Sequence, residues 1–75
     1  ALQRTIRRGL VLVAETRRDW QAAEGEARAW IEADPQSALA LERLGHALVA
    51  QRQIPEGLSS LSRARERDPA LAPPE

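Results

Sequence analysis

The chain has 75 residues, and its 11 arginines balance its 11 acidic residues, so the formal net charge is zero. A domain dedicated to nucleic-acid binding is expected to be basic, so this balance argues against one. The absence of cysteine excludes disulfides and thiolate metal sites. The single histidine excludes a metal site built from several histidines of this chain.

The N-terminal region resembles a targeting segment only superficially. Residues 10–14 are apolar and follow three arginines, but this run is too short for a signal peptide and Glu15 follows it at once. No stretch is long enough to span a membrane. Because the chain begins with Ala1 rather than Met, we expect it to be part of a longer protein.

Proline and capping residues divide the chain into four predicted helices. Ala, Leu, Arg, Glu and Gln, which favour helix, fill most positions. Asp19 and Ser37 can cap helix N-termini, and Pro55 suits a first helical turn. Asp34-Pro35 and Asp68-Pro69 end helices because a residue before proline avoids the α region. We therefore expect helices at about 4–17, 19–33, 37–52 and 55–68.

Each predicted helix carries apolar residues on one side at helical spacing. In the first helix we expect this face to consist of Ile6, Leu10, Val13 and Ala14, with positions 11 and 12 widening it. The first helix is basic and the second acidic, which favours their pairing, although exposed ion pairs contribute only about 0–1 kcal/mol each. The short connections predict that neighbouring helices run antiparallel.

The sequence also repeats at an offset of 34 residues. The matching pairs are Leu10 and Leu44, Arg18 and Arg52, and Pro35 and Pro69. Residues 32–35 match residues 66–69 at three of four positions. A helix-turn-helix unit of 34 residues is the period of the tetratricopeptide repeat.

The second unit, residues 38–71, resembles the tetratricopeptide repeat family closely. Its matching positions are Leu41, Leu44-Gly45 and Leu48 in the first helix, Gly57, Leu61 and Ala64 in the second, and the closing Pro69. The resemblance implies that the small residues let two antiparallel helices approach and that the large ones fill the space between them.

The first unit, residues 4–37, resembles the family less. It has Val11 in the place of glycine, Ala27 in the place of a bulky residue and Trp30 in a small-residue place. The two units together imply a single all-α domain over residues 1–75, made of antiparallel helix-turn-helix repeats as in a fragment of an α-solenoid. An unrelated four-helix bundle is the alternative architecture.

We find no pattern that indicates catalysis. His46 could form a triad with Ser59, Ser60 or Ser62, but no nucleophile elbow accompanies these residues. The four glycines are too scattered for a phosphate-binding loop. We therefore expect no enzyme activity and no cofactor, with His46 solvated or lining a groove.

In the tetratricopeptide family, the first helices of successive units line a groove that receives a peptide or helix. The resemblance implies such a groove between the first and third predicted helices, lined by Arg8, Leu12, Glu15, Leu39, Glu42, His46 and Val49. This surface mixes apolar side chains with both signs of charge and lacks the Lys and Asn pattern of the family's carboxylate clamp. The favoured function is protein–protein interaction, and an ordinary solvated face is the plain alternative.

Two further functions stay open. The chain could be a structural scaffold or self-association module within a larger enzyme or secretion assembly. Two repeats are fewer than such arrays usually need, so an apolar edge made of Leu58, Leu61 and Leu71 would be left to mediate homo-oligomerisation. The weaker alternative is nucleic-acid binding through the Arg-rich first helix. Trp20 and Trp30 do not favour it, since both fall on an apolar helix face and are better explained by core packing than by base stacking.

Overall fold

A computed structural model of the chain describes the backbone of residues 2–71 and the side chains of residues 6–70. Four α-helices follow one another: α1 (Leu2–Thr16), α2 (Trp20–Ala33), α3 (Ala38–Ala50) and α4 (Ile54–Arg67). A short 3-10 turn, η1 (Pro69–Leu71), comes after α4 and was not predicted. The described residues contain no strand. The all-α class is confirmed, and the predicted helix bounds hold to within two residues at each end.

The predicted capping residues begin their helices as expected. The Asp19 side chain accepts a hydrogen bond from the Ala22 N–H at 3.2 Å, and the Ser37 hydroxyl accepts one from the Ala40 N–H at 3.1 Å. Pro55 lies in the first turn of α4, where its missing N–H costs no helical hydrogen bond. The chain leaves α2 at Asp34 and α4 at Asp68, the residues that precede the two prolines.

The turns after α1 and α3 have the same backbone structure. Arg18 and Arg52 both adopt positive φ, 57° and 68° respectively. The N–H that follows each arginine bonds back to a helical carbonyl: Asp19 to Ala14 at 3.0 Å, and Gln53 to Leu48 at 2.9 Å. This is the Schellman ending of a helix. The 34-residue period of the sequence therefore recurs in the backbone.

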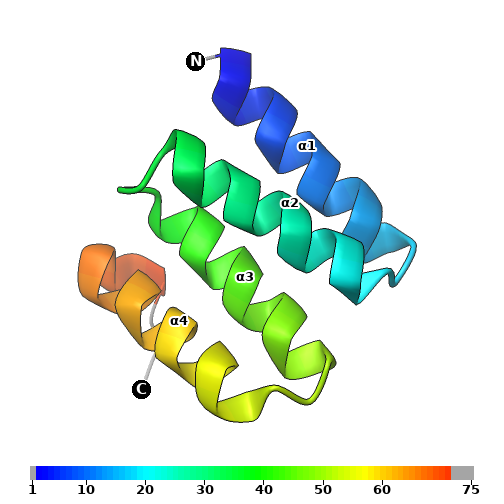
Figure 1. The fold of residues 1–75 in the computed structure, drawn as a ribbon. Coiled ribbons are helices and arrows are strands. Elements are labelled where there is room, and N and C mark those ends of the chain that lie inside the picture. Colours follow the sequence, from blue (N-terminus) through cyan, green and yellow to red (C-terminus); the bar gives the residue numbers. More distant parts are fainter. Residues whose placement is uncertain (1, 72–75) are drawn as a thin grey trace.

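Figure 1 shows the four helices arranged in chain order, with α1 and α4 at the two ends of the row. Each helix packs against the next one, and α1 also touches α3. Within the described part of the chain, no Cα atom of α4 lies within 8 Å of a Cα atom of α1 or α2.

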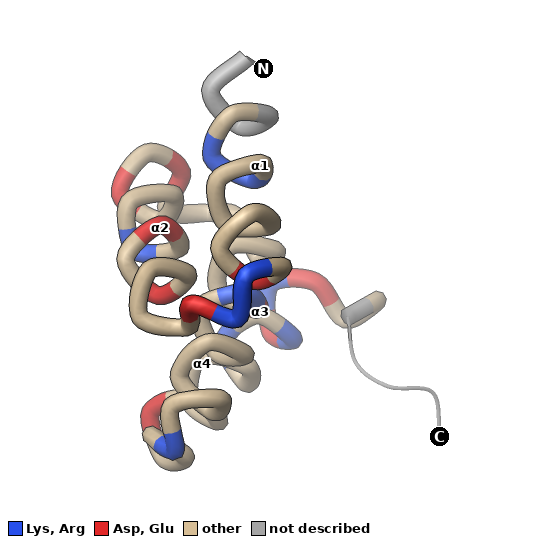
Figure 2. Tube along the Cα trace, turned by 90° about the vertical axis from the view of Figure 1, so that its right-hand side faces the viewer, with Lys and Arg blue, Asp and Glu red and all other residues tan. Residues whose placement is uncertain are grey.

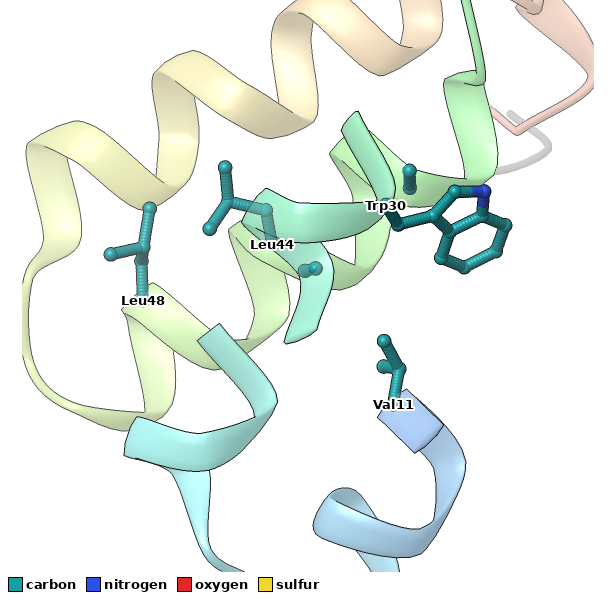
Figure 3. Close-up of a cluster of buried hydrophobic side chains, with 6 residues drawn as sticks. Val11, Trp30, Leu44 and Leu48 are labelled. Atoms are coloured by element: carbon teal, nitrogen blue, oxygen red, sulfur yellow. The ribbon is translucent and has the colours of Figure 1, made fainter. Parts of the chain in front are cut away.

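Two clusters of buried apolar side chains lie between α1, α2 and α3. Trp30, only 3% exposed, packs with Val11, Leu44 and Leu48, and two alanines complete this cluster (Figure 3). A second cluster joins the three helices nearer the α1–α2 turn, where Trp20 packs against Ala14, Ala23 and Ala47. Both tryptophans therefore contribute to packing, as predicted.

The expected apolar face of α1 was largely wrong. Ala14 is buried, but Ile6, Leu10 and Val13 are exposed, and Val11 is the fully buried residue of this helix. The reason is that α2 covers only the side of α1 that carries Val11 and Ala14. No other helix of the described chain covers the side that carries Ile6, Leu10 and Val13.

Candidate interaction face of α1 and α3

An ion pair links α1 to α3 across the predicted groove. The Arg43 guanidinium donates to the Glu15 carboxylate at 3.4 Å and lies 3.9 Å from Glu42. Both carboxylates were predicted to line the groove, but Arg43 was not. In the sequence, only the position of Arg43 next to Glu42 on a predicted helix could have indicated an ion pair, because its partner Glu15 on α1 is 28 residues away.

The predicted groove residues are accessible to different degrees. Arg8, Leu12 and His46 are exposed, while Glu15, Leu39 and Glu42 are half-buried. Val49 is half-buried too, but it lies against α4: its Cγ2 is 2.6 Å from the point that a Cβ atom on Gly57 would occupy. We therefore exclude Val49 from the interaction face. The side chain of Leu71, predicted at the C-terminal edge, lies outside the described residues, whereas Leu58 is exposed and Leu61 is half-buried.

Two of the predicted groove residues meet at a surface pocket of about 510 Å³. Arg8 approaches it from α1, and Leu39 lies at the start of α3. The remaining lining residues come from the end of α2, the α2–α3 turn and the end of α4: Trp30, Asp34, Gln36, Ser37, Ala38, Arg67 and Asp68. We call this the Arg8 pocket.

Trp30 gives the Arg8 pocket an unusual feature. Its indole Nε1 is buried and has no hydrogen-bond partner among the described residues. A buried donor without an acceptor is unfavourable by about 1–3 kcal/mol. Figure 3 shows this nitrogen on the part of the ring that points away from Leu44 and Leu48. Trp30 thus brings to the lining of the Arg8 pocket a buried donor that no described residue satisfies.

The charges around the Arg8 pocket are mixed. Two arginines and two aspartates line it. The Arg67 guanidinium is engaged by the Pro35 carbonyl oxygen, to which it donates. Arg8 has no ion-pair partner within the described part of the chain. The N-terminus of α3, with its partial positive charge, also borders the pocket through Ser37 and Ala38. The arrangement suits a carboxylate or carbonyl oxygen near Arg8.

Charge is also distributed unevenly between the first two helices. Figure 2 shows acidic positions along α2 and basic positions along α1. Within α2, Glu24 accepts a hydrogen bond from Arg28 at 3.0 Å and one from the Gln51 amide at 2.9 Å. The Gln51 amide and the Arg28 guanidinium hold the pKa of Glu24 below its ordinary value. Gln51, which also donates to the Trp20 carbonyl at 3.3 Å, thereby connects α3 to α2.

A second pocket, of about 430 Å³, lies on another side of α3, between α2 and α4. Leu41, Leu44 and Leu48 line it together with charged side chains, which include Arg28, Glu32, Glu56 and Arg63. This pocket was not predicted, because the spacing of the three leucines indicates a buried helix face. They are indeed buried, and a residue pattern does not reveal that α2 and α4 leave a gap above them.

The other chemical candidates remain dispersed. His46 is exposed on α3, Ser60 is buried on α4, and no hydrogen bond joins His46 to a serine in the described region. Residues 2–71 hold no group of three or more His, Cys, Asp or Glu side chains that could bind a metal ion. None of the described helices is long and apolar enough to cross a membrane.

Comparisons with known proteins assign no family. No protein-family model, no curated protein and no solved structure matches the chain.

Proposed function

We propose that the chain is a non-catalytic interaction module that binds a segment of a partner protein along α1 and α3. The observation that carries this proposal is the Arg8 pocket. It combines an arginine and a buried indole N–H that both lack a partner among the described residues with a half-buried leucine. These three groups lie on three different helices, α1, α3 and α2, which fix their spacing.

The chemistry of the Arg8 pocket indicates the class of partner. A carboxylate could accept a charge-assisted hydrogen bond from Arg8, the stronger kind of hydrogen bond. An oxygen of the same partner could accept from the Trp30 Nε1, while an adjacent apolar side chain packs on Leu39. Leu12, exposed on α1, extends the apolar surface. The expected ligand is thus an extended or helical peptide in which an acidic residue, or the C-terminal carboxylate, neighbours a bulky apolar residue.

We also propose a tetratricopeptide-like arrangement for the two hairpins. It is supported by the recurrence of backbone features at 34 residues, such as φ of −144° at Asp34 and −139° at Asp68. The helix contacts add support. In an up-down-up-down four-helix bundle the first and fourth helices are neighbours, whereas no Cα atoms of α1 and α4 come within 8 Å of each other within residues 2–71.

Selection from a library of random peptides displayed on phage tests the proposed function. Wild-type protein should enrich peptides that place Asp, Glu or a free C-terminal carboxylate beside a bulky apolar residue. Arg8→Glu should lose these peptides, because it removes the donor and adds a like charge. Arg63→Glu is the matched control, since Arg63 is also exposed but lines the pocket between α2 and α4.

The opposite results would reject the proposal. Equal enrichment by wild type and Arg8→Glu would exclude the Arg8 pocket as the binding site. Loss of binding in Arg63→Glu but not in Arg8→Glu would move the site to the pocket between α2 and α4. Circular dichroism and thermal unfolding of each variant would establish that the fold is kept.

A further inference from the structure

The large exposed apolar side chains concentrate on the two outermost helices. On α1, Ile6, Leu10 and Val13 are 52%, 42% and 50% exposed. On α4, Ile54 and Leu58 are 41% and 54% exposed. Among the described residues, the only other exposed large apolar side chain is Leu12, which is 40% exposed and belongs to the groove side of α1. The two ends of the row in Figure 1 thus carry apolar surface that no other described residue covers.

The 34-residue period shows what covers the equivalent surface inside the chain. Shifted by 34 positions, the exposed residues of α1 coincide with Ala40, Leu44 and Ala47, all of which are buried on α3. Leu44 and Ala40 pack with α2 residues in the main core cluster, and Ala47 packs with α2 in the second. The exposed face of α1 is therefore the counterpart of the α3 face that α2 covers.

The exposed face of α4 corresponds in the same way to the α2 side of the interface between α2 and α3. Shifted back by 34 positions, Ile54 and Leu58 coincide with Trp20 and Glu24 of α2. Trp20 packs against the cluster that contains Ala47, and Glu24 accepts a hydrogen bond from Gln51 at the end of α3. One copy of the chain thus carries both halves of an α2–α3 interface, one at each end.

We propose that copies of this chain associate head to tail, with α4 of one copy packing antiparallel on α1 of the next as α2 packs on α3. Such an interface joins two different surfaces, so it does not close on itself after two copies, and it permits longer assemblies. It uses neither Arg8 nor Leu12, so it is independent of the partner-binding function proposed above.

The equivalence specifies the contacts between copies. Ile54 of one copy would lie over Val13 of the next, as Trp20 lies against the cluster of Ala47. These side chains are large, which sets the helix axes toward the wide end of the usual range of about 8–10 Å.

Polar groups at the two ends of this interface have opposite effects. Arg17 occupies the place of Gln51, so it can donate to the Ile54 carbonyl as Gln51 donates to Trp20. At the other end, Arg65 and Arg7 lie 34 positions from Ile31 of α2 and Leu41 of α3 respectively. Ile31 and Leu41 line a common pocket. These two arginines would approach each other. Because salt screens like charges near a surface, association should strengthen as NaCl is added.

Sedimentation velocity of two single variants and their mixture tests the proposal. The wild-type chain should sediment faster as its concentration rises into the millimolar range, and more so at high salt. Leu10→Glu alone and Leu58→Glu alone should each be monomeric, since every interface needs one α1 face and one α4 face. Their equimolar mixture should form a species of twice the monomer mass and nothing larger, because each variant retains the face that the other has lost.

Leu12→Glu is the matched control, since Leu12 lies on α1, is 40% exposed and is outside both faces. It should associate like the wild type. A wild-type chain that stays monomeric at high concentration and high salt would overturn the proposal. So would association of Leu10→Glu alone, which would indicate a symmetric contact through α4. If either variant loses helicity by circular dichroism, Val13→Glu and Ile54→Glu replace the pair with the same expected outcomes.

Discussion

Gly45 on α3 and Gly57 on α4 lie backbone against backbone. A Cβ atom placed on either glycine would be 3.0 Å from the carbonyl oxygen of the other. A Cβ on Gly45 would also be 2.6 Å from Cγ of Leu61. Both glycines are buried in helices, where glycine is less favourable than alanine by roughly 1 kcal/mol. Close approach of α3 and α4 explains why glycine occupies these positions.

We therefore expect Gly45→Leu to destabilise the chain by about 1–3 kcal/mol, because the added side chain must displace Leu61 or the α4 backbone. Thermal and urea unfolding monitored by circular dichroism measure this change. Gly25→Ala is the control, since no atom lies within 4 Å of a Cβ placed there. It should stabilise α2 by up to about 1 kcal/mol. A higher melting temperature for Gly45→Leu would contradict the close contact.

The two arginines at positive φ allow a second prediction. Arg18 and Arg52 lie where a Schellman ending usually has glycine, and an L-residue is strained in this conformation. Arg18→Gly and Arg52→Gly should each raise the free energy of unfolding by about 0.5–1 kcal/mol, the strain relieved minus the greater chain entropy of glycine. Arg17→Gly, one position earlier and without positive φ, should lower it. Equal effects of all three substitutions would contradict the prediction.

Glu24 predicts how stability changes with pH. Its pKa is lowered in the folded chain, mainly by the Gln51 amide and also by Arg28. A lowered pKa contributes stability that is fully present above the unfolded value of about 4.3. This stability is lost as pH falls through the lower folded value. Urea unfolding of wild type and Glu24→Gln between neutral and acid pH measures it.

The difference in stability between wild type and Glu24→Gln should be largest near neutral pH and should shrink below the ordinary range of a glutamate. Glu66→Gln, which changes the net charge equally at an exposed position of α4, controls for general charge effects. A difference that is constant with pH would show that the Gln51 contact does not depend on the charge of Glu24.

The sequence predicted the helices well because their ends depend on local chemistry. Ser37 and Asp19 form the expected caps, and the prolines stop α2 and α4 within a residue of the expected place. In contrast, which side of α1 is buried depends on which other helices pack against it, and local chemistry does not determine this. Val13 and Leu10 have the spacing of a core face, yet they are exposed because α2 packs on the side of Val11.

The candidate interaction face was predictable only in part for the same reason. Arg8 and Leu39 were expected on one surface, and the structure brings both to one pocket. The contribution of Trp30 was not predicted. Its apolar position indicated burial, but the lack of an acceptor for its N–H depends on the surroundings that three helices create. Arg43 was missed because its partner lies on a helix distant in sequence.

Trp30→Phe separates the role of Trp30 in the core from the binding role that we propose for it. Phenylalanine keeps an aromatic ring in the cluster with Val11 and Leu44, but it has no N–H group. The loss of packing is partly offset because a buried donor without an acceptor, unfavourable by about 1–3 kcal/mol, is removed. We therefore expect the free energy of unfolding to change by no more than about 1 kcal/mol, whereas Trp30→Ala should lose about 3–5 kcal/mol.

Binding of an acidic peptide selected by phage display should respond differently. Trp30→Phe should weaken it by about tenfold, because a hydrogen bond to a charged acceptor contributes about 1.5–3 kcal/mol and about 1.4 kcal/mol corresponds to a factor of ten. Isothermal titration calorimetry measures the affinity. In wild-type protein, the indole ¹H–¹⁵N signal of Trp30 should move on peptide addition, while that of Trp20 should not. Unchanged affinity in Trp30→Phe, with a stationary indole signal in the wild type, would show that the peptide does not reach the Trp30 N–H.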